Sequence, residues 1–135
     1  MDKKFKIIIA GDREFNNFSL AKEIINQVLL EKNLHNVCVV SGGIKGADSL
    51  GEEFAKLNGC DLKVFKANWM VYHEKAGTLR DEEMIKFSDA AILFWNGESM
   101  GTHNMITLAT ENNKTLFVVY YDKYTQQLIE IKKTP

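Results

Sequence analysis

The chain has 135 residues and a formal net charge of -1, because 17 lysines and arginines are balanced by 18 aspartates and glutamates. Its length predicts a single domain spanning residues 1–135, and its contents of apolar (45%) and charged (26%) residues exclude disordered and low-complexity classes. The balanced charge disfavours bulk binding to nucleic acid, which needs a cationic surface.

The sequence carries no signal of membrane insertion, secretion or metal binding. The longest apolar runs are far shorter than the roughly 18 residues that span a bilayer, and the N-terminus turns polar at Asp12. We therefore expect a cytoplasmic protein. Cys38 and Cys60 form no CxxC motif and have no histidine at ligand spacing, so we expect reduced thiols, with no cofactor and no metal.

Buried strands and amphipathic helices alternate along the chain. Continuous apolar runs that stop at a glycine or a polar residue predict strands covered on both faces. Apolar residues at three- and four-residue spacing predict helices, the first of which has Asn17 as a candidate N-cap and ends near Asn33. In chain order, we expect a strand at 4–10, a helix at 18–33, a strand at 37–41, a helix at 48–57, a short strand at 62–65, a helix that starts at Ala76 or Thr78 and ends at Phe87, a strand at 90–95, a helix at 101–112 and a strand at 115–121.

This alternation predicts an α/β fold, a Rossmann-like doubly wound parallel sheet of about five strands with helices on both faces. The core of the domain is expected at about 4–121. The C-terminal extension at 122–135 fits a short helix or an edge strand, and the pattern does not decide between them. The second helix is expected to end at Gly59 as C-cap, and its inward-facing residues are expected to be Leu50, Phe54, Ala55 and Leu57.

Loops at one edge of the predicted sheet hold the candidate binding residues. In doubly wound sheets, ligands bind outside the carboxyl ends of the strands, where the loops that follow the strands meet. Glycine-rich turns at 41–46 and 99–102 each follow a strand and open a helix, so their amides and the helix N-terminus favour a phosphate. The alternative is that these glycines only permit tight strand-to-helix connections.

The chain has only two arginines, Arg13 and Arg80, and both lie in segments expected at this edge. A planar guanidinium binds phosphate or carboxylate through two parallel hydrogen bonds, so both are candidate anion ligands, with structural clamps as the alternative. Trp69 is a candidate platform for stacking a nucleobase, and packing over the following helix is the alternative for it.

The motifs of two common nucleotide-binding classes are absent. No GxGxxG follows the first predicted strand and no GxxxxGK[ST] occurs, which argues against a dinucleotide-binding Rossmann domain and a P-loop enzyme. His35 and His73 are expected at the surface, and His103 is expected either to face the ligand or to be solvated.

Five ordered motifs occur along about residues 5–120. They are Gly11-x-Arg13-x-Phe15, Ser41-Gly42-Gly43-x-x-Gly46-Ala47-Asp48, Trp69, Ala76-Gly77-x-x-Arg80-x-x-x-Met84, and Phe94-Trp95-x-Gly97-x-Ser99-x-Gly101-Thr102. Together they resemble the YspA-type branch of the SLOG superfamily, which also contains DprA-like and LOG proteins. The resemblance implies a Rossmann-like sheet whose glycine-rich loops bind nucleotides or nucleotide-derived ligands, and many such proteins are uncharacterised and encoded in phages or conflict systems.

The chain departs from the pattern of this branch at two positions. Asp12 stands where a small hydroxyl residue is usual and Asp81 where an asparagine is usual, and both add negative charge beside the expected anion site. LOG phosphoribohydrolases, which the chain resembles in its arginine and its Gly-Thr turn, have a catalytic glutamate after that turn. This chain has His-Asn-Met at 103–105, so Glu98 or Asp48 supplies an acid only if the fold brings it to the ribose.

Two functions are expected from the residues and the resemblance together. The first is binding of a nucleotide or nucleotide-derived ligand, for sensing or sequestration, with its phosphate on the glycine-rich loops. The alternative is an N-glycosidic phosphoribohydrolase acting on nucleoside monophosphates or related nucleotides, with Glu98 and Asp48 as candidate catalytic residues. A DNA-processing module is disfavoured because the chain lacks a basic patch.

The expected partner is a small molecule of nucleotide type, rather than a nucleic acid or a membrane. A homo-oligomer is expected only because relatives often form one. The candidate ligand-binding residues are Gly11, Asp12, Arg13, Ser41, Gly42, Gly43, Gly46, Asp48, Trp69, Gly77, Arg80, Ser99, Gly101 and Thr102.

Overall fold

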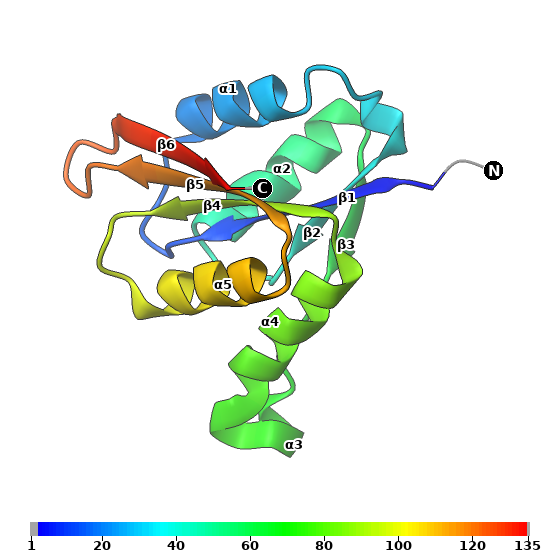
Figure 1. Ribbon diagram of the computed structural model, residues 1–135, viewed down its shortest axis with the longest axis vertical. Helices are drawn as coiled ribbons and strands as arrows, with labels where there is room; N and C mark the ends of the chain where they lie inside the picture. The colour runs from blue at the N-terminus through cyan, green and yellow to red at the C-terminus, as the bar shows by residue number, and fades with distance from the viewer. Residues whose placement is uncertain (1–2, 135) are drawn as a thin grey trace.

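A computed structural model describes residues 3–134, which form one six-stranded sheet with helices on both faces (Figure 1). The strands are β1 (Phe5–Gly11), β2 (Val37–Ser41), β3 (Asp61–Val64), β4 (Ala90–Trp95), β5 (Thr115–Tyr121) and β6 (Leu128–Thr134). The helices are α1 (Phe18–Val28), α2 (Ala47–Asn58), α3 (Trp69–Tyr72), α4 (Ala76–Phe87) and α5 (Met100–Glu111), with 3-10 turns η1 (Leu34–Asn36) and η2 (His73–Lys75).

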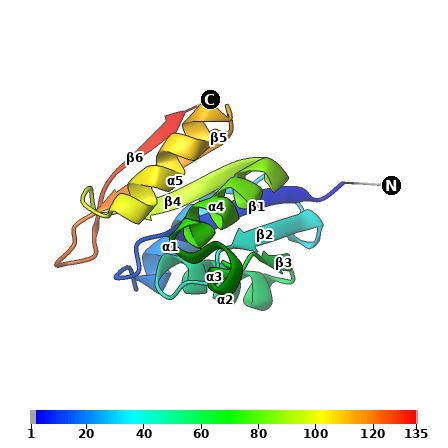
Figure 2. The same ribbon diagram turned by 90° about the horizontal axis from the view of Figure 1, so that it is seen from below.

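The strand order is β3-β2-β1-β4-β5-β6, and Figure 2 shows the strands in this sequence across the sheet. Strands β1 to β5 are parallel, and β1 lies between β2 and β4, so the order reverses there as in doubly wound folds. The predicted α/β fold is therefore confirmed. The sheet has six strands rather than about five, because the C-terminal extension forms the antiparallel edge strand β6 against β5.

Both faces of the sheet are covered, which explains the continuous buried apolar run at 7–10 in its central strand β1. Successive residues of a strand point to opposite faces, yet Ile7, Ile8 and Ile9 are all fully buried. Ile7 and Ile9 pack in the cluster that contains residues of α1 and α2, whereas Ile8 packs with residues of α4 and α5. The two pairs of helices accordingly lie on opposite sides of the sheet (Figure 1).

Two helix details differ from the sequence-based expectation. Helix α1 begins after Asn17, whose side-chain oxygen accepts the Leu20 N–H at 3.1 Å as predicted, but it ends at Val28 rather than near Asn33. Asn33 instead caps the separate 3-10 turn η1. Leu57 was expected to point inward and is 66% exposed, because it follows the buried Ala55 by two positions, about 200° around the helix.

Helix α3 follows β3 as a single turn that the sequence pattern did not predict. All four of its residues are exposed, and it contacts α4 and η2 at the end of the molecule that projects away from the sheet (Figure 1). None of the helices within residues 3–134 is long and apolar enough to cross a bilayer.

Candidate functional site

A cavity of about 750 Å³ lies at the carboxyl ends of β1, β2 and β4, where the loops after these strands meet the start of α4. This is the edge at which the sequence predicted a site. Of the candidate residues, the cavity is lined by Gly11, Asp12, Arg13, Gly42, Gly43, Asp48, Trp69, Gly77, Arg80, Ser99, Gly101 and Thr102.

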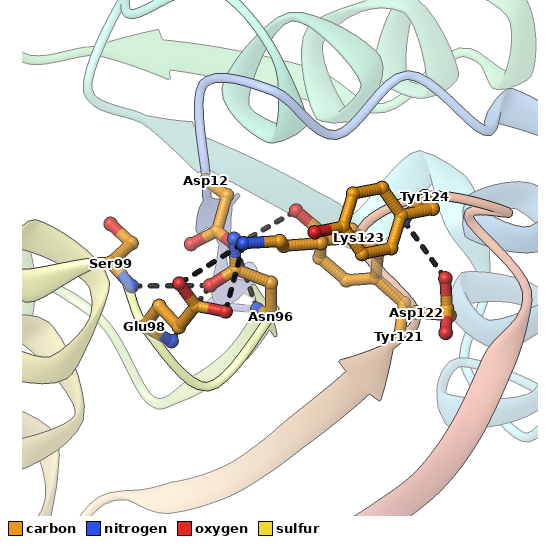
Figure 3. A network of polar contacts seen from close by, with 8 residues as sticks. All are labelled: Asp12, Asn96, Glu98, Ser99, Tyr121, Asp122, Lys123 and Tyr124. Carbon is orange, nitrogen blue, oxygen red and sulfur yellow. Dashed lines mark hydrogen bonds and ion pairs between the residues drawn. The ribbon is translucent and has the colours of Figure 1, made fainter.

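Three candidate residues do not line this cavity. Ser41 is fully buried behind it, where its hydroxyl donates to a Glu52 oxygen at 2.6 Å and accepts the Gly43 N–H at 3.0 Å. Glu98 is exposed and pairs with Lys123, whose Nζ lies 3.2 Å from its carboxylate (Figure 3). Gly46 packs its backbone against the loop after β1, as described next.

Gly46 is required by the close approach of two loops. Its φ of +93° is in the region that favours glycine, and a Cβ there would overlap the backbone carbonyl oxygens of Asp12 and Arg13. The next amide, of Ala47, donates to the Asp12 carbonyl oxygen at 3.1 Å. The loop after β2 is therefore fixed on the loop after β1, and this contact holds Arg13 at the cavity.

The Asp12 carboxylate is buried and accepts hydrogen bonds from three groups, of which Asn96 and Tyr121 are drawn in Figure 3. The Asn96 N–H donates to Oδ2 at 2.7 Å and the Tyr121 hydroxyl donates to the same oxygen at 2.8 Å. The Thr102 hydroxyl donates to Oδ1 at 2.5 Å. Burial is the main cause that raises the pKa of Tyr121, and the hydrogen bond to Asp12 raises it further. This hydroxyl therefore keeps its proton. The carboxylate thus ties β1 to the α5 N-terminus and to the end of β5.

Asp48 lies in the first turn of α2 and places its carboxyl on the cavity floor. Its Oδ2 accepts the Gly42 N–H at 2.8 Å and its Oδ1 accepts the Gly11 N–H at 3.3 Å. Burial raises the pKa of Asp48 from 3.8 to about 7, although both amides and the nearby Arg80 guanidinium favour the charged form. The carboxyl therefore takes up and releases a proton near neutral pH.

Arg80 is held in place by hydrogen bonds on two sides. Its Nη1 donates to the Gly42 carbonyl oxygen at 3.2 Å and its Nε donates to Asp81 Oδ1 at 3.1 Å. Its side chain is only 10% exposed. Burial raises the pKa of the Asp81 carboxyl, and the adjacent guanidinium opposes this shift. Arg80 is thus both a clamp on the loop after β2 and a cation at the cavity wall.

Trp69 extends over the start of α4 at the mouth of the cavity. A Cβ placed on Gly77 would lie 3.6 Å from the indole Cη2 and 3.7 Å from Arg80 Nη2. The indole and the guanidinium therefore both lie close to Gly77, and Trp69 remains 56% exposed. Trp69 therefore packs over α4 and still leaves part of its indole exposed for stacking.

The cavity wall also contains charged residues that the sequence did not single out, namely Glu14, Lys66 and Glu74. Lys66 follows β3, so it lies at the carboxyl ends of the strands, where ligands of doubly wound sheets bind. It was not among the candidate residues because β3 is short and the loop after it was not considered. In total the acidic lining residues are Asp12, Glu14, Asp48, Glu74 and Asp81, and the basic ones are Arg13, Lys66 and Arg80. Within residues 3–134, no three His, Cys, Asp or Glu side chains cluster as metal ligands would.

Comparison with known proteins identifies a family and individual proteins to which this chain is similar. The model of the YspA, cpYpsA-related SLOG family matches residues 5–72. The Gene 61 protein of Mycobacterium phage D29 is 27% identical over 105 residues, which cover 73% of this chain and 83% of that protein.

Among solved structures, DNA processing protein A (DprA) from Streptococcus pneumoniae is similar with a TM-score of 0.64 at 16% sequence identity. The match covers 86% of this chain and 50% of the DprA chain, so this chain spans about half the length of that protein. At this low identity the likeness shows a shared fold.

Proposed function

Because the chain belongs to the YspA and cpYpsA-related SLOG family, we propose that its cavity binds a nucleotide or a nucleotide-derived ligand, for sensing or sequestration. Membership in a SLOG family points to a nucleotide-related role, in binding or in processing. The finer assignment rests on the chemistry of the cavity itself. This cavity lies at the edge of the sheet where doubly wound folds bind their ligands.

One observation carries the proposal: the only two arginines of the chain line the same cavity. Arg13 and Arg80 are 67 positions apart in the sequence, on different elements, whereas Lys66 is the one lysine among the lining residues. Guanidinium groups suit phosphate because they donate two parallel hydrogen bonds and remain charged at every accessible pH. Two of them at one cavity support an anionic ligand group there.

The phosphate is proposed at the start of α5, beside Arg13, rather than on the loop after β2. The Gly42 and Gly43 amides already donate to Asp48 and Ser41, so they are not free for a ligand. Gly101 lies in the first turn of α5 and is exposed, and no neighbouring atom lies within 4 Å of the position that a Cβ would occupy there. First-turn amides carry the positive end of the helix dipole, which favours an anion.

The remaining parts of the ligand are proposed to extend toward α3 and α4. The half-exposed indole of Trp69 offers a face on which any nucleobase can stack. Trp69 and Arg80 both approach Gly77, so a base stacked on the indole is proposed to lie on the Arg80 side of the cavity. This arrangement leaves the middle of the ligand, with its ribose and any second phosphate, above Asp48 and Arg80.

Thermal unfolding with a panel of NAD, AMP, ADP-ribose, cyclic ADP-ribose and ribose 5-phosphate tests the proposal. A ligand at 100 times its dissociation constant stabilises the chain by roughly 2.7 kcal/mol. We expect at least one nucleotide to raise the melting temperature, with the rise lost in Arg13→Ala and in Arg80→Ala. Lys22→Ala on the exposed surface of α1 is the control. No shift with any nucleotide, or shifts unchanged in both arginine variants, would contradict the proposal.

A second candidate function, N-glycosidic hydrolysis, is favoured by one observation: a buried carboxyl that titrates near neutral pH lines the cavity at Asp48. Such a group can donate a proton to a departing base while water adds at C1′ of the ribose. Chromatography of AMP incubated with the chain tests this function, with free adenine and ribose 5-phosphate as the expected products. Glu98 lies outside the cavity lining, so Glu98→Gln is expected to keep any such activity that Asp48→Asn removes.

A further inference from the structure

The Gly42 peptide group lies between Asp48 and Arg80. Its N–H donates to Asp48 Oδ2 at 2.8 Å, and its carbonyl oxygen accepts from Arg80 Nη1 at 3.2 Å. A Cβ on Gly42 would lie 2.9 Å from the Asp48 oxygen and 3.5 Å from Arg80 Nε, so the acid and the cation flank this residue closely. The Asp48 carboxyl and the Arg80 guanidinium are thus linked by hydrogen bonds to the same peptide group, and both residues line the cavity.

The Asp48 carboxyl has two hydrogen-bonding states that suit different ligand groups. The ionised form can only accept hydrogen bonds, so it repels a phosphate and binds hydroxyl or amine donors. The neutral form carries one O–H, which needs an acceptor because both oxygens already face amide donors from Gly42 and Gly11. A phosphate oxygen in the cavity is such an acceptor. Protonation therefore converts a repulsive contact into a hydrogen bond.

The charges that face Asp48 make its proton sensitive to what Arg80 binds. Arg80, from α4, stabilises the ionised carboxylate, and Asp81 from the same helix opposes it. The other charged groups of the cavity wall are Asp12, Arg13 and Glu14 after β1, Lys66 after β3 and Glu74 in η2. Asp12 is committed to three internal donors. An anion on Arg80 offsets the positive charge that stabilises the ionised Asp48 carboxylate.

We infer that Asp48 and Arg80 form a proton-linked binding pair, so that an anionic ligand that engages Arg80 is taken up together with a proton on the Asp48 carboxyl. The inference rests on the proposed function of this cavity and adds a recognition rule to it. The pKa of Asp48, raised by burial to about 7, places the exchange within the neutral range. By reciprocity, the ligand is bound more tightly as the pH falls through this value.

Titration calorimetry of the full chain with ADP-ribose tests the pair. Each phosphate of ADP-ribose carries one ester and one anhydride linkage and has no second ionisable hydroxyl, so neither titrates between about pH 6 and pH 8 and any proton taken up belongs to the protein. Binding is measured in two buffers of different ionisation enthalpy at each pH. We expect uptake of up to one proton above pH 7, and an affinity that falls by as much as about tenfold per pH unit there.

Two variants assign the proton to its residue. Asp48→Asn is expected to bind ADP-ribose with no proton uptake and with an affinity independent of pH over this range. Glu53→Gln, an exposed carboxylate-to-amide change on the same helix, is expected to keep the wild-type uptake. If Asp48→Asn does not fold, infrared spectroscopy of the wild-type chain replaces it. A protonated-carboxyl band that grows when ADP-ribose is added is then the expected result.

The outcomes separate the inference from the function on which it rests. Binding without proton uptake, or unchanged uptake in Asp48→Asn, overturns the pair and leaves nucleotide binding intact. Absence of binding by ADP-ribose, AMP and the other nucleotides at every pH overturns both.

Discussion

The Tyr121 hydroxyl donates a buried hydrogen bond of 2.8 Å to the Asp12 carboxylate, across 109 positions of the sequence. The bond joins the end of β1 to the end of β5, and Thr102 and Asn96 bring the start of α5 and the loop after β4 to the same carboxylate. Its negative charge is therefore shared among three internal donors. Asp12 thus has a structural role in this chain.

Removing the Tyr121 hydroxyl is expected to destabilise the fold. Tyr121→Phe leaves the buried Asp12 carboxylate with two donors in place of three, and a hydrogen bond to a charged group contributes about 1.5–3 kcal/mol. Urea unfolding of both proteins measures this loss. Tyr124→Phe, at a residue that is 84% exposed, is the matched control and is expected to change stability by less than about 0.5 kcal/mol. Equal stability of the two variants would contradict the network.

Asp48 makes the free energy of unfolding depend on pH between about 4 and 7. The pKa of Asp48 is about 7 in the folded chain and has an ordinary value of 3.8, so the folded state binds more protons in this window. Stability from this group therefore falls as the pH rises, by a total on the order of 4 kcal/mol, and is constant above pH 7.

Urea unfolding at about pH 5 and about pH 8 measures that slope. Asp48→Asn should lose a large part of the difference, whereas Glu53→Gln should keep it, because Glu53 is exposed on the same helix. A pH slope that is the same in Asp48→Asn as in the wild-type chain would show that this carboxyl is already ionised across the window.

Two glycines at the cavity edge are expected to respond in opposite ways to alanine. Gly46→Ala forces a side chain into the Asp12 and Arg13 carbonyl oxygens at a φ of +93°, and should cost at least about 3 kcal/mol of stability. Gly101→Ala meets open space within helix α5, so it should be neutral or should stabilise by up to about 1 kcal/mol. Thermal unfolding compares the two, and a tolerated Gly46→Ala would mean that the loops after β1 and β2 are not held in contact.

Much of the fold was readable from the sequence, and the misses have local physical causes. The strands at 37–41, 90–95 and 115–121 were predicted with the bounds that the structure has, because sheets covered on both faces need unbroken apolar runs. The sequence pattern at 122–135, where β6 forms, did not distinguish an edge strand from a short helix. The exposed residues of an edge strand do not have to be apolar, so they show no clear periodicity. Helix α3 was missed because a single turn shows no periodicity.

Most candidate site residues lie on loops, and the hydrogen bonds among them could not be predicted from the sequence. The glycines and both arginines could be expected at one edge because parallel strands bring their carboxyl ends together. The sequence did not indicate that Asp48 accepts the Gly42 amide or that the Thr102 hydroxyl binds Asp12. Such pairings depend on side-chain directions that only the folded loops define.

Trp69 is expected to contribute to ligand affinity with little effect on stability. Stacking of a base on an aromatic ring contributes about 1–3 kcal/mol, so Trp69→Ala should weaken nucleotide binding by about tenfold or more. Because the side chain is 56% exposed, the melting temperature of the free chain should change little. Met70→Ala, at an 89% exposed neighbour on α3, is the control for binding. Equal affinities of both variants would remove Trp69 from the binding site.

The most direct measurement of nucleotide binding at this cavity is an NMR titration of the isotope-labelled chain with ADP-ribose. We expect chemical-shift changes at the cavity, at the amides of Arg13, Gly101 and their neighbours and at the Arg80 and Trp69 side chains. Lys3, Lys4 and Lys6, which line a second, smaller hollow, are the internal comparison. Changes confined to those lysines, or no changes at saturating ADP-ribose, AMP and NAD, would contradict nucleotide binding at this cavity.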